Sequence, residues 1–345
     1  MSTMAPATAA PARSGRGPSA LLAGVTSNRF FQPAAIAVAL FVALVVIPAS
    51  LQAYWVGNFM QMAVFAPVVA SAGLLYGRVG LVSLGQVAPY GIGTWVTIRL
   101  GFATHLPYPV LVLIAGLVAM LLGVLIGLPA LRVSGLYLAL VTLMLAAGME
   151  IVLSTTKFAN GGHGFKGLVK TLSEIKPMRR PSWATTDVGY YRFCVIAAFV
   201  LLALAAAFLA GKPGRAWASI RQSEAAALSA GIDVTRYKML AFALASFMAG
   251  AGGGLFAATI SKNMTFVAFN RQAAIFLIAV TVMGGIHSLW GGVLGAFFAT
   301  CLLNFLKQNV VGHKFWDRFS LSLFGFGLLM NLIQGTRAMQ KKGLL

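Results

Sequence analysis

Residues that could carry out chemistry are scarce in this sequence, which holds six acidic residues and four histidines among 345. The histidines are scattered, without the HExxH spacing of a zinc hydrolase, and the two cysteines lie in separate apolar runs. No GxSxG motif, no GxxxxGKS or GxxxxGKT motif and no paired intramembrane carboxylates are present. We therefore expect no catalytic residue, no metal site, no bound cofactor and no ATP hydrolysis by this chain.

Three polar residues in or beside apolar runs are candidates for a route through a membrane: Gln86, Tyr90 and Glu150. Glu150 is an acidic residue near the end of a long apolar run, and intramembrane carboxylates are costly and often functional. A carboxylate at a span end also commonly just reaches the interface. Gln86 and Tyr90 flank Pro89 in an irregular segment, where they would either line a pathway or bond a neighbouring helix.

The polar stretch 211–238 predicts a short helix between two apolar segments, parallel to the membrane. Pro213–Gly214 should break the preceding helix, and residues 215–230 are good helix formers. Gly231 fits a helix C-cap, and Asp233 lies close to an N-cap position for the next apolar run.

Small residues dominate the middle of this predicted helix. Ala225, Ala226 and Ala227 form a smooth surface beside the charges of Arg221 and Glu224, and a groove in a partner protein could receive such a helix. An ordinary amphipathic loop helix would show the same pattern.

The elements that must position these residues are transmembrane helices. Hydrophobic residues make up 59% of the chain and charged residues only 9%, whereas a soluble domain carries about 25% charged residues. The sequence therefore predicts an all-α, polytopic transmembrane helical bundle. The net charge of +20 comes from loop residues, not from one basic face, so we expect no nucleic acid as a partner.

Apolar segments long enough to be candidate spans occur along the whole chain, and we expect about 8–10 of them to cross the membrane. The segments are 34–51, 55–77, 80–98, 107–129, 135–154, 192–210, 239–260, 272–286, 289–306 and 319–334. Polar residues interrupt 80–98, and 272–286 is short, so we expect one or two broken or re-entrant helices. Close helix packing is predicted by the GxxxG pairs Gly73/Gly77, Gly123/Gly127, Gly250/Gly254 and Gly291/Gly295.

Residues 1–30 are rich in Ala, Ser, Pro and Arg, which predicts a disordered cytoplasmic tail. Residues 31–337 form the expected membrane domain, and 338–345 form a second cytoplasmic tail. An even number of spans places both termini on one side. The bias of basic residues does not choose that side, because the long loop 155–191 holds six of them and makes the two sides equal.

Several blocks of this sequence resemble the LivM-like permeases of branched-chain amino acid ABC importers. The longest reads GRAWASIRQSEAAALSAGIDVTRYKMLAFALASFMAGAGGGLFA (214–257) and contains an EAA-type coupling loop. The others read LPALRVSGLYLALVTL (128–143), NGGHGF (160–165) and VMGGIHSLWGGVLGA (282–296). These blocks keep the order of the family and cover most of residues 70–300.

The resemblance implies a permease of the bacterial inner membrane that moves branched-chain or related hydrophobic amino acids inward by ATP-driven alternating access. The implied partners are a second, LivH-like permease, two ATP-binding subunits that hold ATP and Mg²⁺, a periplasmic or lipid-anchored substrate-binding protein, and membrane lipids. Loop 211–238 would then be cytoplasmic and loop 155–191 periplasmic. The residues implied in ATPase coupling are Arg215, Arg221, Glu224, Ala226, Ala227 and Gly231.

Two alternatives stay open at this point. Relatives of the family carry urea, amides or small carboxylates, and the scarcity of intramembrane charge suits those solutes equally. An ion-coupled secondary transporter is the alternative from another class, although such transporters use buried carboxylates or unwound carbonyl sites at the membrane midplane.

Overall fold

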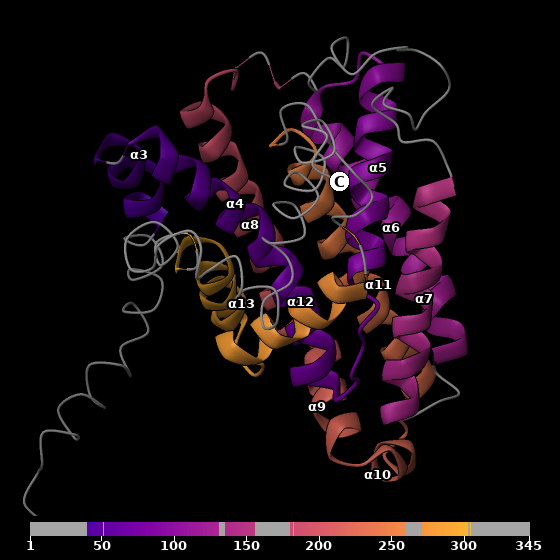
Figure 1. Cartoon of the computed structure of the whole chain (residues 1–345). Coiled ribbons are helices and arrows are strands. Elements are labelled where there is room, and N and C mark those ends of the chain that lie inside the picture. The colour runs from indigo at the N-terminus through magenta and orange to yellow at the C-terminus, as the bar shows by residue number, and fades with distance from the viewer. Residues whose placement is uncertain are drawn as a thin grey trace, which may run out of the picture. The chain divides into compact units, whose positions relative to one another are not determined.

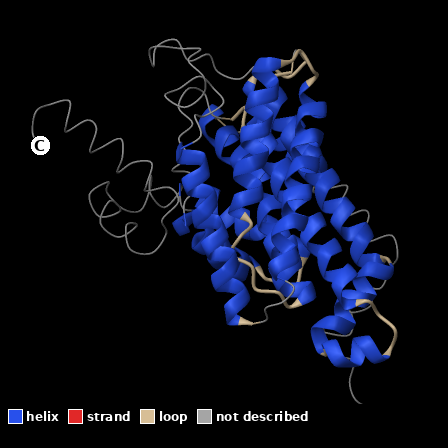
Figure 2. Ribbon diagram, turned by 90° about the vertical axis from the view of Figure 1, so that its right-hand side faces the viewer, coloured by secondary structure: helices blue, strands red, loops and turns tan. Residues whose placement is uncertain are grey.

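The computed structural model describes residues 40–50, 52–130, 135–155, 180–181, 183–259, 269, 271–302 and 304. All regular elements in this described part are helices (Figure 2), which confirms the all-α prediction. The chain divides into two units, 1–50 and 51–345. The described part of the first unit holds η1 (Val42–Val46), a π-helix, and α3 (Ile47–Ser50). The predicted tails 1–30 and 338–345 lie outside the described residues.

The second unit is a helical bundle (Figure 1). Its elements are α4 (Ala53–Gly73), η2 (Leu74–Val79), α5 (Val87–Ala103), α6 (Tyr108–Ala130), α7 (Leu136–Thr155), α8 (Asp187–Ala210), α9 (Lys212–Gln222), α10 (Glu224–Ser229), α11 (Val234–Phe256), α12 (Arg271–Gly284), α13 (Leu289–Phe297) and η5 (Phe298–Leu302).

Four helices in the described residues are long and apolar enough to cross a membrane: Ala53–Val79, Tyr108–Leu125, Asp187–Ala210 and Val234–Phe256. They confirm the predicted spans in these four regions. A shorter apolar helix, Tyr137–Val152, lies within α7. The predicted span at 319–334 lies outside the described residues.

Helical structure is interrupted at two places, near the two segments that the sequence singled out as broken or re-entrant. η2 ends at Val79, and Gly80 after it has a φ of 83°. The predicted segment 80–98 therefore begins outside a helix, and its helical part, α5, starts at Val87. α12 and α13, which the sequence predicted as two separate spans, meet at an angle of 114°, so together they form one broken span or a re-entrant loop. Gly285 takes a φ of 101° in this turn, and Ser288 caps α13 by accepting a hydrogen bond from the Trp290 amide. Both breaks therefore occur where a glycine reaches the left-handed region.

α11 lies at the centre of the bundle and packs against α4, α5 and α6 (Figure 1). Its glycines allow this contact on several sides at once. A Cβ at Gly250 would overlap Ala119 of α6, one at Gly252 would press on Val68 of α4, and one at Gly253 would overlap the Tyr90 carbonyl of α5. Dispersion and polar contacts must hold helices together in lipid, and small residues bring the backbones close enough to make them.

The GxxxG prediction is confirmed for all four pairs, because each glycine lies against another element. Gly73 and Gly77 of the α4–η2 segment face the turn between α12 and α13, and Gly123 and Gly127 face α11. Gly250 and Gly254 face α5 and α6, whereas Gly291 and Gly295 face the end of α12.

The contact between Gly93 of α5 and Gly250 of α11 gives a direct test of this packing. A Cβ at Gly93 would overlap the backbone carbonyl of Gly250, which cannot move aside as a side chain could. We expect Gly93→Ala to lower the free energy of unfolding by roughly 1–3 kcal/mol. The measurement is the thermal unfolding of the purified protein in detergent.

Gly148→Ala is the matched control. Gly148 lies inside α7 and a Cβ there meets nothing within 4 Å, so this change should be neutral or stabilise by roughly 0.5–1 kcal/mol. Equal effects of the two substitutions would contradict the proposed backbone contact.

Candidate functional site

The polar stretch 211–238 forms two short helices and not the single helix 215–230 that its composition predicts. α9 and α10 are separated at Ser223, whose backbone is extended (φ −161°, ψ 121°) and whose hydroxyl accepts a hydrogen bond from the Ala226 amide at 3.3 Å. Serine competes with a continuous helix in this way because its side chain can cap the next one. The prediction of one continuous helix was therefore wrong.

The predicted break at Pro213–Gly214 was also wrong, because α8 ends one turn earlier. Gly211 separates α8 from α9, and Pro213 lies in the first turn of α9, where its missing N–H has no intrahelical partner to lose. Gly214 continues α9, and it packs so closely that a Cβ there would overlap the Leu209 carbonyl.

α9 is fixed to the bundle by an apolar face of Ala216, Trp217 and Ile220, all of them buried. Trp217 is completely inaccessible to solvent, and its indole N–H donates to the Tyr237 carbonyl of α11 at 2.8 Å. A buried indole with its one donor satisfied makes a strong anchor. The remaining face of α9 is therefore held in a defined position.

α10 is fixed by one buried alanine and one ion pair. Ala227 is buried, and Glu224 accepts from the Lys238 ammonium of α11 at 2.7 Å. The Lys238 side chain is only 7% exposed, whereas that of Glu224 is 52% exposed. Since a buried cation without a partner is costly, Glu224 is the group that makes this position of Lys238 tolerable.

Arg221 joins the end of α9 to both broken segments of the bundle. Its Nη1 donates to the Gly77 carbonyl at 2.6 Å and lies 3.2 Å from Nδ1 of His287, in the turn between α12 and α13. The stem of Arg221 also lies against Gly80, where a Cβ would come within 3.3 Å of Cγ. One side chain therefore links the loop to η2 and to the turn before α13.

The caps predicted around Gly231 are confirmed. Gly231 has a φ of 77°, its amide donates to the Leu228 carbonyl, and the Ile232 amide donates to the Ala227 carbonyl, which is the hydrogen-bond pattern of a Schellman motif. Asp233 then caps α11 by accepting from the Arg236 amide at 3.1 Å, and it also pairs with the Arg236 guanidinium.

The six residues singled out in this loop therefore fall into two groups. Arg221, Glu224, Ala227 and Gly231 make the contacts or turns that hold the loop against the bundle. The other two, Arg215 and Ala226, are exposed.

The sequence reasoning missed several residues that shape or anchor loop 211–238. Leu228 is 60% exposed beside Ala225 and Ala226, although it is a large apolar residue. Trp217 and Lys238 anchor the loop from beneath. The three- and four-residue spacing of the apolar positions in α9 was the signal that could have identified Trp217.

The three pathway candidates do not form one cluster in the structure. Gln86 and Tyr90 lie on the first turn of α5 and are both buried. The Gln86 side-chain carbonyl makes a long contact, 3.5 Å, with the Ser71 hydroxyl of α4, whereas the Tyr90 ring packs among phenylalanines (Phe65, Phe256 and Phe269). Glu150 is half-buried on a different helix, α7. Within the described residues, no group of histidines, cysteines and carboxylates could hold a metal ion.

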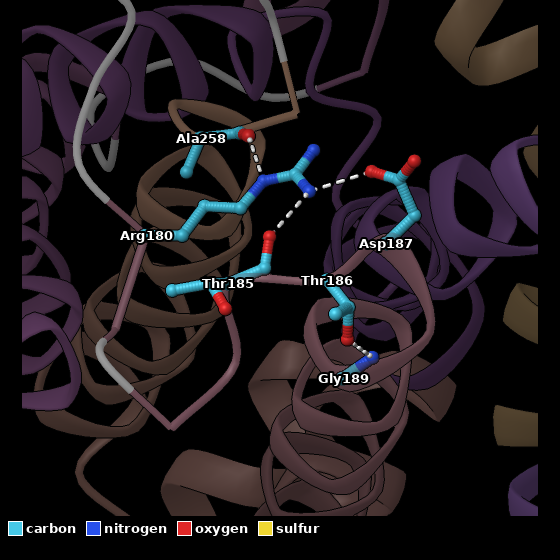
Figure 3. A network of polar contacts seen from close by, with 6 residues as sticks. All are labelled: Arg180, Thr185, Thr186, Asp187, Gly189 and Ala258. Atoms are coloured by element: carbon cyan, nitrogen blue, oxygen red, sulfur yellow. Dashed lines mark hydrogen bonds and ion pairs between the residues drawn. The ribbon is translucent and has the colours of Figure 1, made fainter.

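A second polar network lies at the opposite end of α8 and α11 (Figure 3). The Arg180 guanidinium pairs with Asp187 at 2.6 Å, and it also contacts the carbonyls of Thr185 and Ala258. It lies 5.2 Å from the centre of the Tyr190 ring, close enough for a cation–π contact. This network ties the segment before α8 to the residues just after α11.

Aromatic hydroxyls extend the network into the bundle. Tyr108 of α6 donates to the Gly254 carbonyl at 2.6 Å, Tyr190 of α8 donates to the Leu255 carbonyl at 2.5 Å, and the two hydroxyls lie 3.0 Å apart. The last carbonyls of a helix lack intrahelical partners, so these side chains complete the end of α11.

A family model described as "Branched-chain amino acid transport system / permease component" matches residues 54–332. The chain is 32% identical, over 250 residues, to the high-affinity branched-chain amino acid transport system permease proteins LivM of Salmonella typhimurium and Escherichia coli. Each of these matches covers 65% of this chain and 56% of the relative.

A further relative is the autoinducer 2 import system permease protein LsrC of Klebsiella pneumoniae. It is 30% identical over 205 residues, which cover 58% of this chain and 55% of the relative. The chain therefore spans just over half the length of these curated relatives. No solved structure matches it significantly.

The ion pair between Glu224 and Lys238 gives a test of how α10 is held. Glu224→Gln leaves the Lys238 ammonium buried without a carboxylate, so the free energy of opening α10 should fall by roughly 1–3 kcal/mol. We expect a value near the lower limit because Glu224 is half exposed to screening water. Amide hydrogen exchange over residues 224–231 should then be about fivefold faster.

The double variant Glu224→Gln with Lys238→Met removes both partners and should exchange at nearly the native rate. Native exchange in the single variant would show that the pair does not hold α10.

Proposed function

Because the chain belongs to the branched-chain amino acid transport system permease family, we propose that it is one of two permease subunits of an ABC importer and couples to an ATPase through α9 and α10. It is a multi-pass protein of the inner membrane. The observation that carries the proposal is the exposed surface of α10. Ala225 and Ala226 present small side chains there, and Ala227 and the Glu224–Lys238 ion pair anchor the helix to the bundle from beneath. A partner can press on such a surface and move α11 with it.

The proposed cycle is alternating access driven by ATP hydrolysis on two partner subunits, which hold the nucleotide and Mg²⁺. α11 runs from Asp233, beside α10, to the network at its other end, so a displacement of the loop reaches the far end of the bundle. The second permease would be LivH-like, and a substrate-binding protein would deliver the solute.

We propose branched-chain or related hydrophobic amino acids as the substrates, following the two LivM relatives. The LsrC relative favours a second candidate, a small polar solute of another class, and urea, amides and small carboxylates belong to the same alternative. Buried hydroxyl and amide groups in the described spans, such as Ser71, Gln86, Thr94 and Thr97, are neutral and suit any of these solutes. Ligand profiling of the partner binding protein decides between them.

The coupling role is tested at Ala226, which is exposed and makes no side-chain contact that the fold needs. Ala226→Trp should block docking and lower ATP-dependent uptake by about tenfold or more, the loss that removal of about 1.4 kcal/mol of docking energy would cause. Uptake is measured in proteoliposomes containing the assembled transporter.

Ala226→Ser keeps the surface small and is the control at the same position. Both variants should be inserted and folded like the native protein, because the side chain faces solvent. Native uptake by the tryptophan variant would exclude α10 from the coupling surface.

The orientation is tested by cysteine labelling in intact cells. We propose that loop 211–238 is cytoplasmic and loop 155–191 periplasmic. The 24 residues of α8 are about 36 Å long, enough to separate these two loops by the thickness of a membrane. A cysteine at Thr185 should therefore react with an impermeant thiol reagent, and one at Ala225 should not.

Both positions are exposed, and the native Cys194 and Cys301 are buried, so the background of labelling should be low. The reverse labelling pattern would overturn the proposed orientation.

A further inference from the structure

A cavity of about 390 Å³ opens between η2, the end of α8 and α9. Two arginines, Arg78 and Arg221, line it together with Gln222. Gly214, in the first turn of α9, also lines the cavity, and the positive end of a helix dipole favours an anion there. Leu209 and Ala218 form the apolar part of the cavity lining.

The cationic groups of this cavity are available to a ligand. Arg78 is exposed, and its side chain makes no hydrogen bond or ion pair with any residue that the structure describes. Arg221 is held in place through one nitrogen, Nη1, by Gly77 and His287. A guanidinium has five N–H donors, so Arg221 retains donors that can bind an oxyanion while its position stays fixed.

No carboxylate is among the described residues that line the cavity, and the acidic residues of the adjoining loop have partners elsewhere. Glu224 pairs with Lys238, and Asp233 pairs with Arg236. The cavity therefore carries two positive charges that the described part of the chain does not neutralise.

An exposed stripe runs along α8 toward the end of the helix that borders this cavity. Its residues recur every three or four positions and are all apolar: Ile196, Phe199, Val200, Ala203, Ala206, Ala207 and Ala210. The stripe ends beside Leu209, which lines the cavity. In a membrane, such a stripe contacts acyl chains, and the end of the span lies at the depth of the lipid phosphates.

We propose that this cavity binds the phosphate of an anionic lipid headgroup. Arg78 and Arg221 would bind the phosphate, and the acyl chains would lie along α8 near its last residue, Ala210. Arg221 also links α9 to η2 and to the turn before α13, so the lipid would brace the junction at which these elements meet. The proposal rests on the position of α8 in the membrane. It does not depend on whether α10 docks on an ATPase.

The test uses the full chain, purified with the subunits that assemble with it, in nanodiscs that contain phosphatidylglycerol and phosphatidylcholine. Native mass spectrometry counts the lipids that each variant retains. Arg78→Gln removes one ligand, and Gln222→Glu places a carboxylate in the cavity without a change of size. We expect each to lower retention of phosphatidylglycerol about fivefold, as the loss of one cation near an anionic surface should.

Arg215→Gln is the matched control, because Arg215 is exposed on the same helix but does not line the cavity. It should retain phosphatidylglycerol like the native protein. The thermal unfolding midpoint of each variant shows whether a loss of lipid reflects a loss of fold. If Arg78→Gln does not fold, Gln222→Glu decides the question.

Three results would overturn the proposal. An equal loss of lipid in Arg215→Gln would show general charge attraction, without a site. Displacement of the lipid by millimolar inorganic phosphate would identify free phosphate as the ligand. Retention of the lipid only after the ATPase subunits are stripped from the assembly would assign the cavity to acidic groups of that partner.

Discussion

Direct contact between helix backbones is the constraint on which the rest of this structure depends. Lipid offers no hydrophobic force to press apolar helices together, so the bundle relies on close approach. α11 achieves it with a glycine run in which Gly250, Gly252 and Gly253 each lie against a different neighbouring helix. Larger side chains at these positions would separate α11 from α4, α5 and α6 at the same time. The central helix can therefore move only as part of a packed group.

The two ends of α11 are held by different chemistry. At its start, charged groups fix it to the loop, through the Asp233 cap and the pair between Lys238 and Glu224. At its end, hydroxyls and a guanidinium from other elements bond the unpaired carbonyls, as Tyr108 and Tyr190 do. The loop and the far network are thus linked by one helix that is tightly packed along its length. Such a helix transmits displacement, because packed interfaces shift as units and do not deform continuously.

Local features of the candidate site could be predicted from the sequence, whereas its long-range contacts could not. Gly231 and Asp233 follow from capping rules that involve only a few neighbouring residues. The break at Ser223 escaped because helix propensity and serine capping compete there, and the outcome depends on the docking of α10. The partner of Arg221 is Gly77, 144 residues away, and no periodicity in the sequence relates the two. The same dependence on distant residues explains why the loop residues were grouped as one surface, although Arg221 and Glu224 bond to the bundle and Ala227 is buried against it.

Because acidic residues are scarce, basic side chains outnumber the carboxylates that could pair with them. In the described part of the chain, Asp187, Glu224 and Asp233 each pair with one basic residue at the end of a helix. These three carboxylates are therefore used to fix helix ends, and none of the three pairs with Arg78. Cations that the chain does not neutralise must find their counter-ions in the surroundings, which for a membrane protein are lipid phosphates and the acidic groups of partner subunits. The interior of the bundle depends less on charge, because small residues such as Gly250 and neutral hydrogen bonds such as the one from Tyr108 to the Gly254 carbonyl hold its helices together.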